Sequence, residues 1–175
     1  MFADPSRNVA YFGLTEGDSV ADFGAGSGAY SLALARRVGN SGYVYAVEVQ
    51  NDLLTRLDRE ALQQGLRNIH VVWGNVEKVG GSKLADGSID AVLISNILFQ
   101  AEARYSLALE AKRVLKPGGR AIVIDWLGSF GGLGPHPNQV ILPDEVKKIF
   151  AEAGFEFVRD FPAGEHHYGL IFRKP

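Results

Sequence analysis

Residues 19–28 read Ser19-Val20-Ala21-Asp22-Phe23-Gly24-Ala25-Gly26-Ser27-Gly28, and they set the architecture of the whole chain. The first half is an apolar run that predicts a buried strand over Ser19–Phe23. The second half is a glycine-rich loop, and apolar residues then recur at helical spacing over Tyr30–Arg37. Glycine has no side chain, so the loop amides can approach a ligand, and the start of a helix favours an anionic group. This unit of strand, glycine loop and helix therefore predicts a binding turn.

The alternation of short apolar runs with helical segments continues to the C-terminus, which is typical of a parallel sheet covered on both faces, an α/β fold. The last two predicted strands are joined by only Phe161–Glu165, so they must be antiparallel, because a parallel return needs a crossover of about a dozen residues or more. The final pair of predicted strands is Phe155–Asp160 and Tyr168–Arg173, and the other predicted strands are Gly42–Val49, Ile69–Trp73, Ile89–Ser95 and Arg120–Trp126. The remaining predicted helices are Asn51–Gly65, Glu102–Leu115 and Pro143–Ala153, and Asn51 and Asp52 are the expected N-cap of the first of them.

Composition narrows the class of protein. The chain has 175 residues, 46% of them hydrophobic, so we expect a single domain over residues 1–175. The formal net charge is −2 with no basic block, which argues against nucleic-acid binding. The chain has no cysteine, no apolar run that would span a bilayer and no signal-peptide pattern at its start. We therefore expect a cytoplasmic protein with no membrane contact and no thiolate chemistry.

The residues that end each strand are the candidate site, because ligands bind outside the carboxyl ends of the strands in an open parallel sheet. Glu48 ends the second strand, twenty residues after Gly28, where a carboxylate can accept hydrogen bonds from a ribose diol. The other strand ends are Gly74-Asn75-Val76-Glu77, Ser95-Asn96 and Asp125-Trp126. Together with the glycine loop, they predict a nucleoside-shaped crevice.

An ordered set of motifs resembles the class I S-adenosylmethionine-dependent methyltransferases. Val20–Gly28 resembles the first motif of that family, and Glu48 matches its ribose-binding acid. Asn75 stands where the family usually has an aspartate, Ile89–Asn96 resembles the fourth-strand motif, and Arg113-Val114-Leu115-Lys116-Pro117-Gly118-Gly119 resembles the family's recognisable "RVLKPGG" run. The resemblance covers almost the whole chain. It implies a Rossmann-like three-layer sandwich whose seven-stranded, mostly parallel sheet has the order 3-2-1-4-5-7-6, with strand 7 antiparallel.

The resemblance also implies S-adenosylmethionine as the cofactor. The glycine loop would line its methionine part, with Asp22 fixing the loop or the amino group, and Glu48 would hold the ribose. Val49, Asn75 and Val76 would lie by the adenine, and Ser95 and Asn96 would close the site near the sulfonium. The full set of expected cofactor residues is Asp22, Gly24, Ala25, Gly26, Ser27, Gly28, Glu48, Val49, Asn75, Val76, Ser95 and Asn96.

The sequence departs from the family pattern at two places. Asn75 in place of aspartate keeps an oxygen that can accept from the adenine amino group but loses the charge, which would lower affinity. Leu98-Phe99-Gln100 stands where many small-molecule relatives carry a histidine, so a base is missing there. Replacing Glu48 with alanine is expected to weaken cofactor binding and to leave thermal stability nearly unchanged.

Methyl transfer from a sulfonium is an in-line displacement, so much of the rate can come from positioning. The chain has no cysteine for covalent catalysis or for an arsenic site. The run Ser95-Asn96-Ile97-Leu98 is not the Asn/Asp-Pro-Pro-Tyr/Phe motif of amino-group methyltransferases. Asp125 is the only carboxylate that ends the fourth or fifth strand, so no metal site is expected. The candidate bases are His136, His166 and His167, although a single histidine is more often an ordinary surface residue.

Three functional hypotheses remain open. The first is a methyltransferase acting on a small-molecule acceptor, which a homodimer or a partner subunit could help to enclose. The second is a non-catalytic subunit that binds S-adenosylmethionine, and the third is an NAD(P)-dependent dehydrogenase, because Gly24, Gly26 and Ala29 also satisfy a degenerate dinucleotide fingerprint. The N-terminal segment with Phe2, Tyr11 and Phe12 would form either a lid over the cofactor or, by our preferred interpretation, a helix packed on the sheet.

Overall fold

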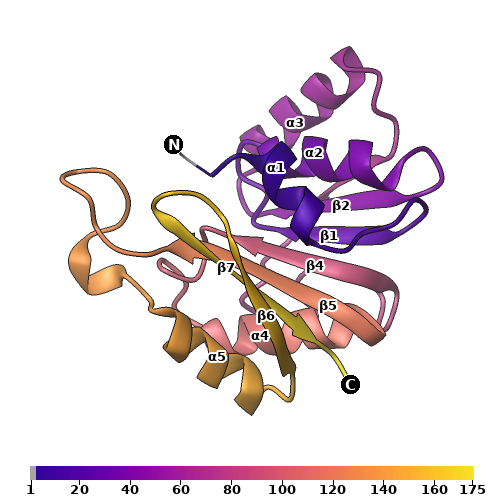
Figure 1. Cartoon of the computed structure of the whole chain (residues 1–175). Coiled ribbons are helices and arrows are strands. Elements are labelled where there is room, and N and C mark those ends of the chain that lie inside the picture. The colour runs from indigo at the N-terminus through magenta and orange to yellow at the C-terminus, as the bar shows by residue number, and fades with distance from the viewer. Residues whose placement is uncertain (1–2) are drawn as a thin grey trace.

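The computed structural model describes residues 3–175, which form one mixed sheet with helices packed on it. The strands are β1 (Ser19–Phe23), β2 (Tyr43–Glu48), β3 (Ile69–Trp73), β4 (Ile89–Ser95), β5 (Leu115–Trp126), β6 (Glu156–Pro162) and β7 (His167–Arg173). Their order is β3-β2-β1-β4-β5-β7-β6 (Figure 1). Neighbours among β1 to β5 pair in parallel, and β7 is antiparallel to both β5 and β6. The expected strand order and the antiparallel strand 7 are confirmed.

Helices cover both faces of this sheet. They are α1 (Pro5–Asn8), α2 (Ala29–Val38), α3 (Asn51–Gln63), α4 (Arg104–Val114) and α5 (Pro143–Glu152), with short 3-10 turns at Val9–Tyr11 and Pro137–Gln139. Figure 1 shows α1, α2 and α3 on one side of the sheet and α4 and α5 on the other, which is the expected three-layer arrangement. Within residues 3–175, no helix combines the length and the apolar character needed to cross a membrane.

The central strands are buried on both faces. Val20 of β1 belongs to the core formed with α2 and the N-terminal segment, whereas Ala21 and Phe23 belong to the core on the side of α4 and α5. Phe12 is only 1% exposed and extends the first core. The N-terminal segment therefore packs on the sheet, which is the arrangement that we preferred to a lid over the cofactor. Phe2 lies outside the described residues. Because both cores hold β1 and β4 in place, the carboxyl ends of these strands form a rigid edge.

Three local predictions were wrong in detail. Asn51 and Asp52 do not cap α3 but are its first residues, and Gln50 is the N-cap without a side-chain hydrogen bond. Strand β5 begins at Leu115, before the Lys-Pro-Gly-Gly run, but this run lies in a register shift, and regular pairing with β4 and β7 resumes at Arg120. The final hairpin connection is shorter than expected, because β6 continues to Pro162 and β7 already begins at His167.

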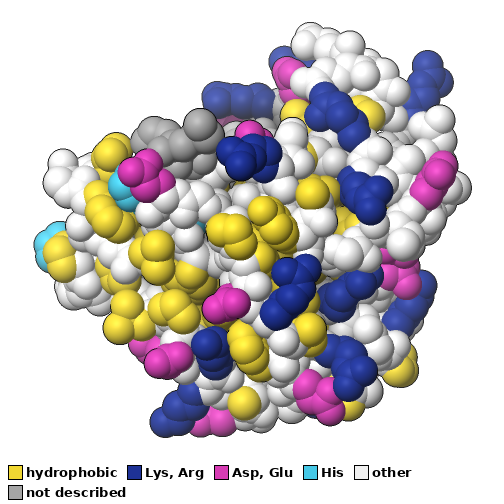
Figure 2. Space-filling view, viewed as in Figure 1, with side chains coloured by type: hydrophobic (Ala, Val, Ile, Leu, Met, Phe, Trp, Pro, Cys, Tyr) yellow, Lys and Arg dark blue, Asp and Glu magenta, His cyan; other side chains and the backbone are white. Residues whose placement is uncertain are grey.

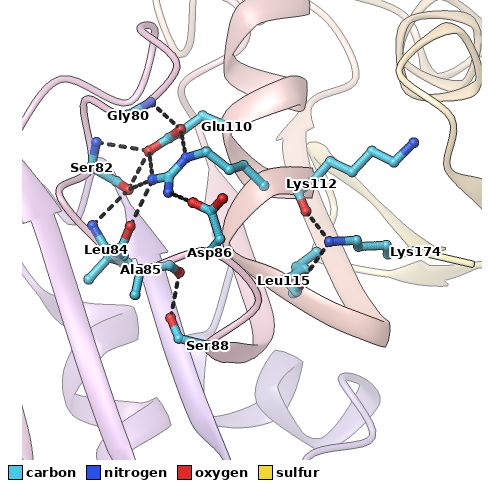
Figure 3. Close-up of polar contacts among 11 residues, drawn as sticks. Gly80, Ser82, Leu84, Ala85, Asp86, Ser88, Glu110, Lys112, Leu115 and Lys174 are labelled. Atoms are coloured by element: carbon cyan, nitrogen blue, oxygen red, sulfur yellow. Dashed lines mark hydrogen bonds and ion pairs between the residues drawn. The ribbon is translucent and has the colours of Figure 1, made fainter.

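A buried carboxylate fastens the segment between β3 and β4 to α4 (Figure 3). Glu110 is fully buried and accepts hydrogen bonds from the amides of Gly80 and Ser82 and from the Arg113 guanidinium. Burial alone would raise the pKa of Glu110, but the hydrogen bonds from Arg113 and Ser82 outweigh it and lower the pKa to about 2. Arg113 also contacts Asp86, so one ion-paired network holds this long connection in place.

Apolar side chains also reach the surface. Figure 2 shows hydrophobic side chains gathered over the part of the molecule that contains the 127–142 segment. Leu127 and Leu133 from this segment are 44% and 46% exposed, and Phe157 and Val158 of the edge strand β6 are 45% and 51% exposed. Leu127 directly follows Trp126 at the carboxyl end of β5, whereas Phe157 and Val158 lie near the start of β6, at the opposite edge of the sheet.

Candidate functional site

One cavity of about 610 Å³ lies at the carboxyl edge of the sheet. Residues at or just after the ends of β1 to β5 line it, and the first residue of β7 lines it too, because β7 runs in the opposite direction. This volume falls in the range of small-molecule and cofactor sites. The position at the carboxyl ends is the one expected for a ligand site in an α/β sheet.

The cavity gathers the residues proposed to hold the cofactor, with one exception. Gly28 does not line it; this residue caps α2 with φ +82°, and a Cβ at Gly28 would lie 2.3 Å from Leu57 Cδ1. Gly28 therefore serves the close packing of α2 against α3. The residues that do line the cavity are Asp22, Gly24, Ala25, Gly26, Ser27, Glu48, Val49, Asn75, Val76, Ser95 and Asn96.

The glycine loop is held by hydrogen bonds to β2. The amides of Gly24 and Ala25 both donate to the Val47 carbonyl oxygen, at 2.8 and 3.1 Å. Gly24 has φ +71°, and a Cβ there would lie 2.3 Å from Ile97 Cδ1, so a side chain is excluded on two grounds. At Gly24 the loop therefore presents backbone, rather than a side chain, to the cavity.

Glu48 is both a lining residue and a structural one. Its Oε2 accepts from the Gly26 amide at 3.0 Å, and its Oε1 accepts from the amides of Val49 and Gln50 at 2.8 and 3.0 Å. The residue is 8% exposed. The three donors are amides of the loop and of the two residues before α3, and because of these bonds we expect alanine at position 48 to lower stability rather than leave it nearly unchanged.

Asp22 places a second carboxylate at the cavity wall. Its Oδ2 accepts from the Ser31 hydroxyl at 2.6 Å, and the residue is 2% exposed. Burial raises the pKa of Asp22 to about 6; the Ser31 hydrogen bond opposes this shift and the neighbouring Glu48 adds to it. A cationic group bound beside Asp22 would favour its charged form.

The residues after β3 form the far wall. Val76 is buried, and the exposed Asn75 uses its Oδ1 to accept from the Glu77 amide at 2.9 Å. The Trp73 ring nitrogen donates to the Val49 carbonyl oxygen at 3.0 Å, which joins the ends of β2 and β3. Asn75 is thus ordered by its own turn while it faces the cavity.

The end of β4 carries polar atoms that lack partners. Asn96 has φ +56°, an unusual value for a residue with a side chain, and its amide donates to the Ile124 carbonyl oxygen at 2.8 Å. The Ser95 hydroxyl and Asn96 Oδ1 are buried without a hydrogen-bond partner among residues 3–175. Strained residues and unpaired buried polar atoms concentrate at functional sites.

Of the three histidines proposed as bases, only His167 lines the cavity. His136 is exposed, and its Nδ1 lies 2.7 Å from Asn138 Oδ1 in the cap of a 3-10 turn. The His166 ring packs against Phe130 with a centroid distance of 4.3 Å. His167 is therefore the remaining candidate among the three proposed bases. His166 and His167 differ because adjacent side chains at the start of a strand point to opposite sides.

Sequence reasoning missed part of the wall. Tyr30, Leu53 and Ile97 also line the cavity, as do Ala3 and Pro5 of the N-terminal segment. That segment is fastened by Asn8, whose Nδ2 donates to the Tyr30 hydroxyl at 2.8 Å and to the Ala163 carbonyl oxygen at 2.9 Å. The sequence does carry one signal for Tyr30, which lies in the first turn of the helix that follows the glycine loop.

Comparisons with known proteins agree with this architecture. Residues 21–123 match the family described as the methyltransferase domain. A crystal structure of a SAM-dependent methyltransferase from Aquifex aeolicus superposes with a TM-score of 0.90 at 29% identity, over 99% of this chain and 91% of that one.

Two curated relatives complete the comparison. An arsenite methyltransferase from Aquipseudomonas alcaligenes is 33% identical over 69% of this chain, which spans only 38% of that protein's length. The ubiquinone/menaquinone biosynthesis C-methyltransferase UbiE of Haemophilus ducreyi is 32% identical over 83% of this chain and 67% of its own length. With its family match, its strand order and its carboxyl-edge cavity, the chain belongs to the class I S-adenosylmethionine-dependent methyltransferases.

Proposed function

We propose that residues 1–175 form a single catalytic domain that transfers a methyl group from S-adenosylmethionine to a small-molecule acceptor. The observation that carries the proposal is the cavity in which a glycine loop, the carboxylates of Asp22, Glu48 and Glu77, and unpaired polar atoms meet. The lack of cysteine continues to favour the cytoplasm as the location.

The donor set fits this cofactor. Asp22, whose buried carboxyl faces the cavity, would bind the amino group of the methionine part, and the amides of the glycine loop would lie beside its carboxylate. Glu48 accepts three backbone hydrogen bonds and retains about one free acceptor position, on Oε2, for a ribose hydroxyl. Asn75 with Val76 would contact the adenine. The unpaired oxygens of Ser95 and Asn96 would find partners in the bound cofactor or acceptor.

The bound cofactor supplies an electrophilic methyl group on a sulfonium, which an acceptor displaces in line. The chain would contribute orientation of the reactants, and the apolar side chains of Pro5, Ile97 and Trp126 in the cavity lining would help to exclude water. Arsenite is not the acceptor that we propose, although a relative carries that name, because the chain has no cysteine to supply thiolate ligands.

Calorimetric titration of ligand-stripped protein with S-adenosylmethionine, S-adenosylhomocysteine and NAD tests the proposal. We expect binding of the first two compounds and no binding of NAD. Binding of NAD alone would restore the dehydrogenase hypothesis. Mass analysis of products from an acceptor panel then separates an active enzyme from a subunit that binds the cofactor without turnover.

A further inference from the structure

Two aromatic side chains meet at the end of the cavity that lies away from β2 and β3. Trp126 ends β5 and His167 begins β7, and these residues are direct partners in the antiparallel pairing. Their ring centroids are 4.2 Å apart with an interplanar angle of 40°. Both residues line the cavity. Because β1 and β4 separate this pair from β2 and β3, it lies apart from the residues proposed for the ribose and the adenine.

His167 is buried and its polar atoms are unused. The residue is 4% exposed, and neither Nδ1 nor Nε2 has a hydrogen-bond partner in the described part of the chain. Burial, with a smaller effect from His166, lowers the pKa of His167 to about 4, so the ring is neutral at physiological pH. A neutral imidazole has one nitrogen that accepts and one that donates a hydrogen bond, and leaving both unpaired in the interior is unfavourable.

The surroundings of this pair favour a neutral ligand over a cation. Within residues 3–175, the carboxylates that line the cavity are Asp22, Glu48 and Glu77, which follow β1, β2 and β3 rather than β5 or β7. Asp125 precedes Trp126, but it does not line the cavity and its oxygens accept from the amides of Trp126 and Phe99 at 2.8 and 3.3 Å. An ammonium group would therefore lack a charged partner here, whereas a hydroxyl group can donate to a neutral imidazole.

We propose that Trp126 and His167 form the acceptor subsite, and that it takes a planar, neutral molecule with a phenol-like hydroxyl group. The ring of the acceptor packs against Trp126, and its hydroxyl group donates a hydrogen bond to the nitrogen of the neutral His167 ring that carries no proton. Asn96 Oδ1, unpaired on the neighbouring β4 end, is a second acceptor for a donor group on the same molecule. This assignment rests on the proposed function, because it names the acceptor class of the same cavity.

The test compares three probes on protein saturated with S-adenosylhomocysteine. Phenol has the hydroxyl donor, anisole keeps the ring but lacks the donor, and benzylamine carries a cation. We expect phenol to bind at least about tenfold more tightly than the other two. Phenol should also shift the imidazole NMR signals that disappear in His167→Phe. The comparison of the three affinities uses only the unaltered chain, so this part of the test does not depend on how a variant folds.

Variants then locate the contact. His167→Phe keeps a ring beside Trp126 but removes both nitrogens, and we expect it to lose at least about tenfold in phenol affinity with unchanged affinity for S-adenosylhomocysteine. His166→Phe is the matched control, since the neighbouring ring does not line the cavity, and it should bind phenol like the unaltered chain.

The outcomes separate the two proposals. Equal binding of phenol and anisole, or full phenol affinity in His167→Phe, would overturn the acceptor assignment while binding of S-adenosylhomocysteine leaves the proposed function standing. If the unaltered chain does not bind S-adenosylhomocysteine, the proposed function is overturned, and the acceptor assignment that rests on it is overturned too.

Discussion

The Glu48 carboxylate and the Gly26 amide are joined by a hydrogen bond of 3.0 Å, although 22 positions separate the two residues in the chain. The bond ties the middle of the glycine loop to the end of β2. With the two further bonds from Val49 and Gln50, one side chain holds both the glycine loop and the two residues that precede α3.

Replacing Glu48 with alanine should therefore reduce both binding and stability. Three amides lose a charged acceptor, partly replaced by water, and we expect a loss of about 2 kcal/mol in the free energy of unfolding. Affinity for S-adenosylhomocysteine should fall at least about tenfold, because a ribose hydroxyl loses its charged acceptor. Urea unfolding and calorimetry measure the two effects. Glu152→Ala, an exposed change on α5, is the control and should alter neither quantity.

Gly28 and Gly65 form a matched pair for separating backbone strain from crowding. Both have left-handed φ values, +82° and +73°, but a Cβ at Gly28 meets Leu57 at 2.3 Å, whereas one at Gly65 has no described atom within 4 Å. Gly65→Ala should cost only the left-handed conformation, about 1 to 2 kcal/mol. Gly28→Ala should cost about 1 to 3 kcal/mol more, from overpacking. Equal losses in urea unfolding would contradict the packing role of Gly28.

The pKa of Asp22 makes stability depend on pH. Because the folded pKa is about 6 against an ordinary value of 3.8, the stability that protonated Asp22 contributes is present in acid and is lost as pH rises through 6. Asp22→Asn stays neutral throughout. The stability of the unaltered chain relative to this variant should therefore fall by about 3 kcal/mol between about pH 4 and pH 7. Parallel stability curves for the two proteins would refute the raised pKa.

Asn75 departs from the aspartate usual in the family, and this departure is testable. A carboxylate accepts a stronger hydrogen bond than an amide oxygen, so Asn75→Asp should tighten S-adenosylhomocysteine binding by about 1 kcal/mol, roughly fivefold. Asn40→Asp adds the same charge at an exposed position outside the cavity and controls for the change in net charge. Unchanged affinity in Asn75→Asp would place the adenine amino group away from this side chain.

Glu110 tests the network that holds the segment between β3 and β4. Glu110→Ala leaves the Arg113 guanidinium and the amides of Gly80 and Ser82 without their partner, and we expect a loss of about 3 to 5 kcal/mol. Since the folded pKa is about 2, below the ordinary 4.5, the stability from Glu110 is present above pH 4.5 and is lost as pH falls towards 2. Asp144→Ala, an exposed acid on α5, should change unfolding by less than about 1 kcal/mol.

Much of the site was predictable, because it lies at strand ends. Glu48, Asn75 and Ser95 could be placed at one edge from the sequence, since carboxyl ends of parallel strands meet there. The sequence could not show in the same way which of His136, His166 and His167 lines the cavity. His167 lines the cavity only because β7 is inserted between β5 and β6 in the opposite direction, which brings its first residue beside Trp126.

The sequence alone determined the succession of strands and helices along the chain, the glycine loop after β1 and the edge at which a ligand would lie. These features depend on local periodicity and on the positions of glycine residues. The tertiary structure alone decided that Gly28 packs on Leu57, that Glu48 holds the loop, and that His167 keeps two unpaired nitrogens beside Trp126. Those relationships join segments far apart in the chain, and only the packing of both cores against the sheet fixes their distances.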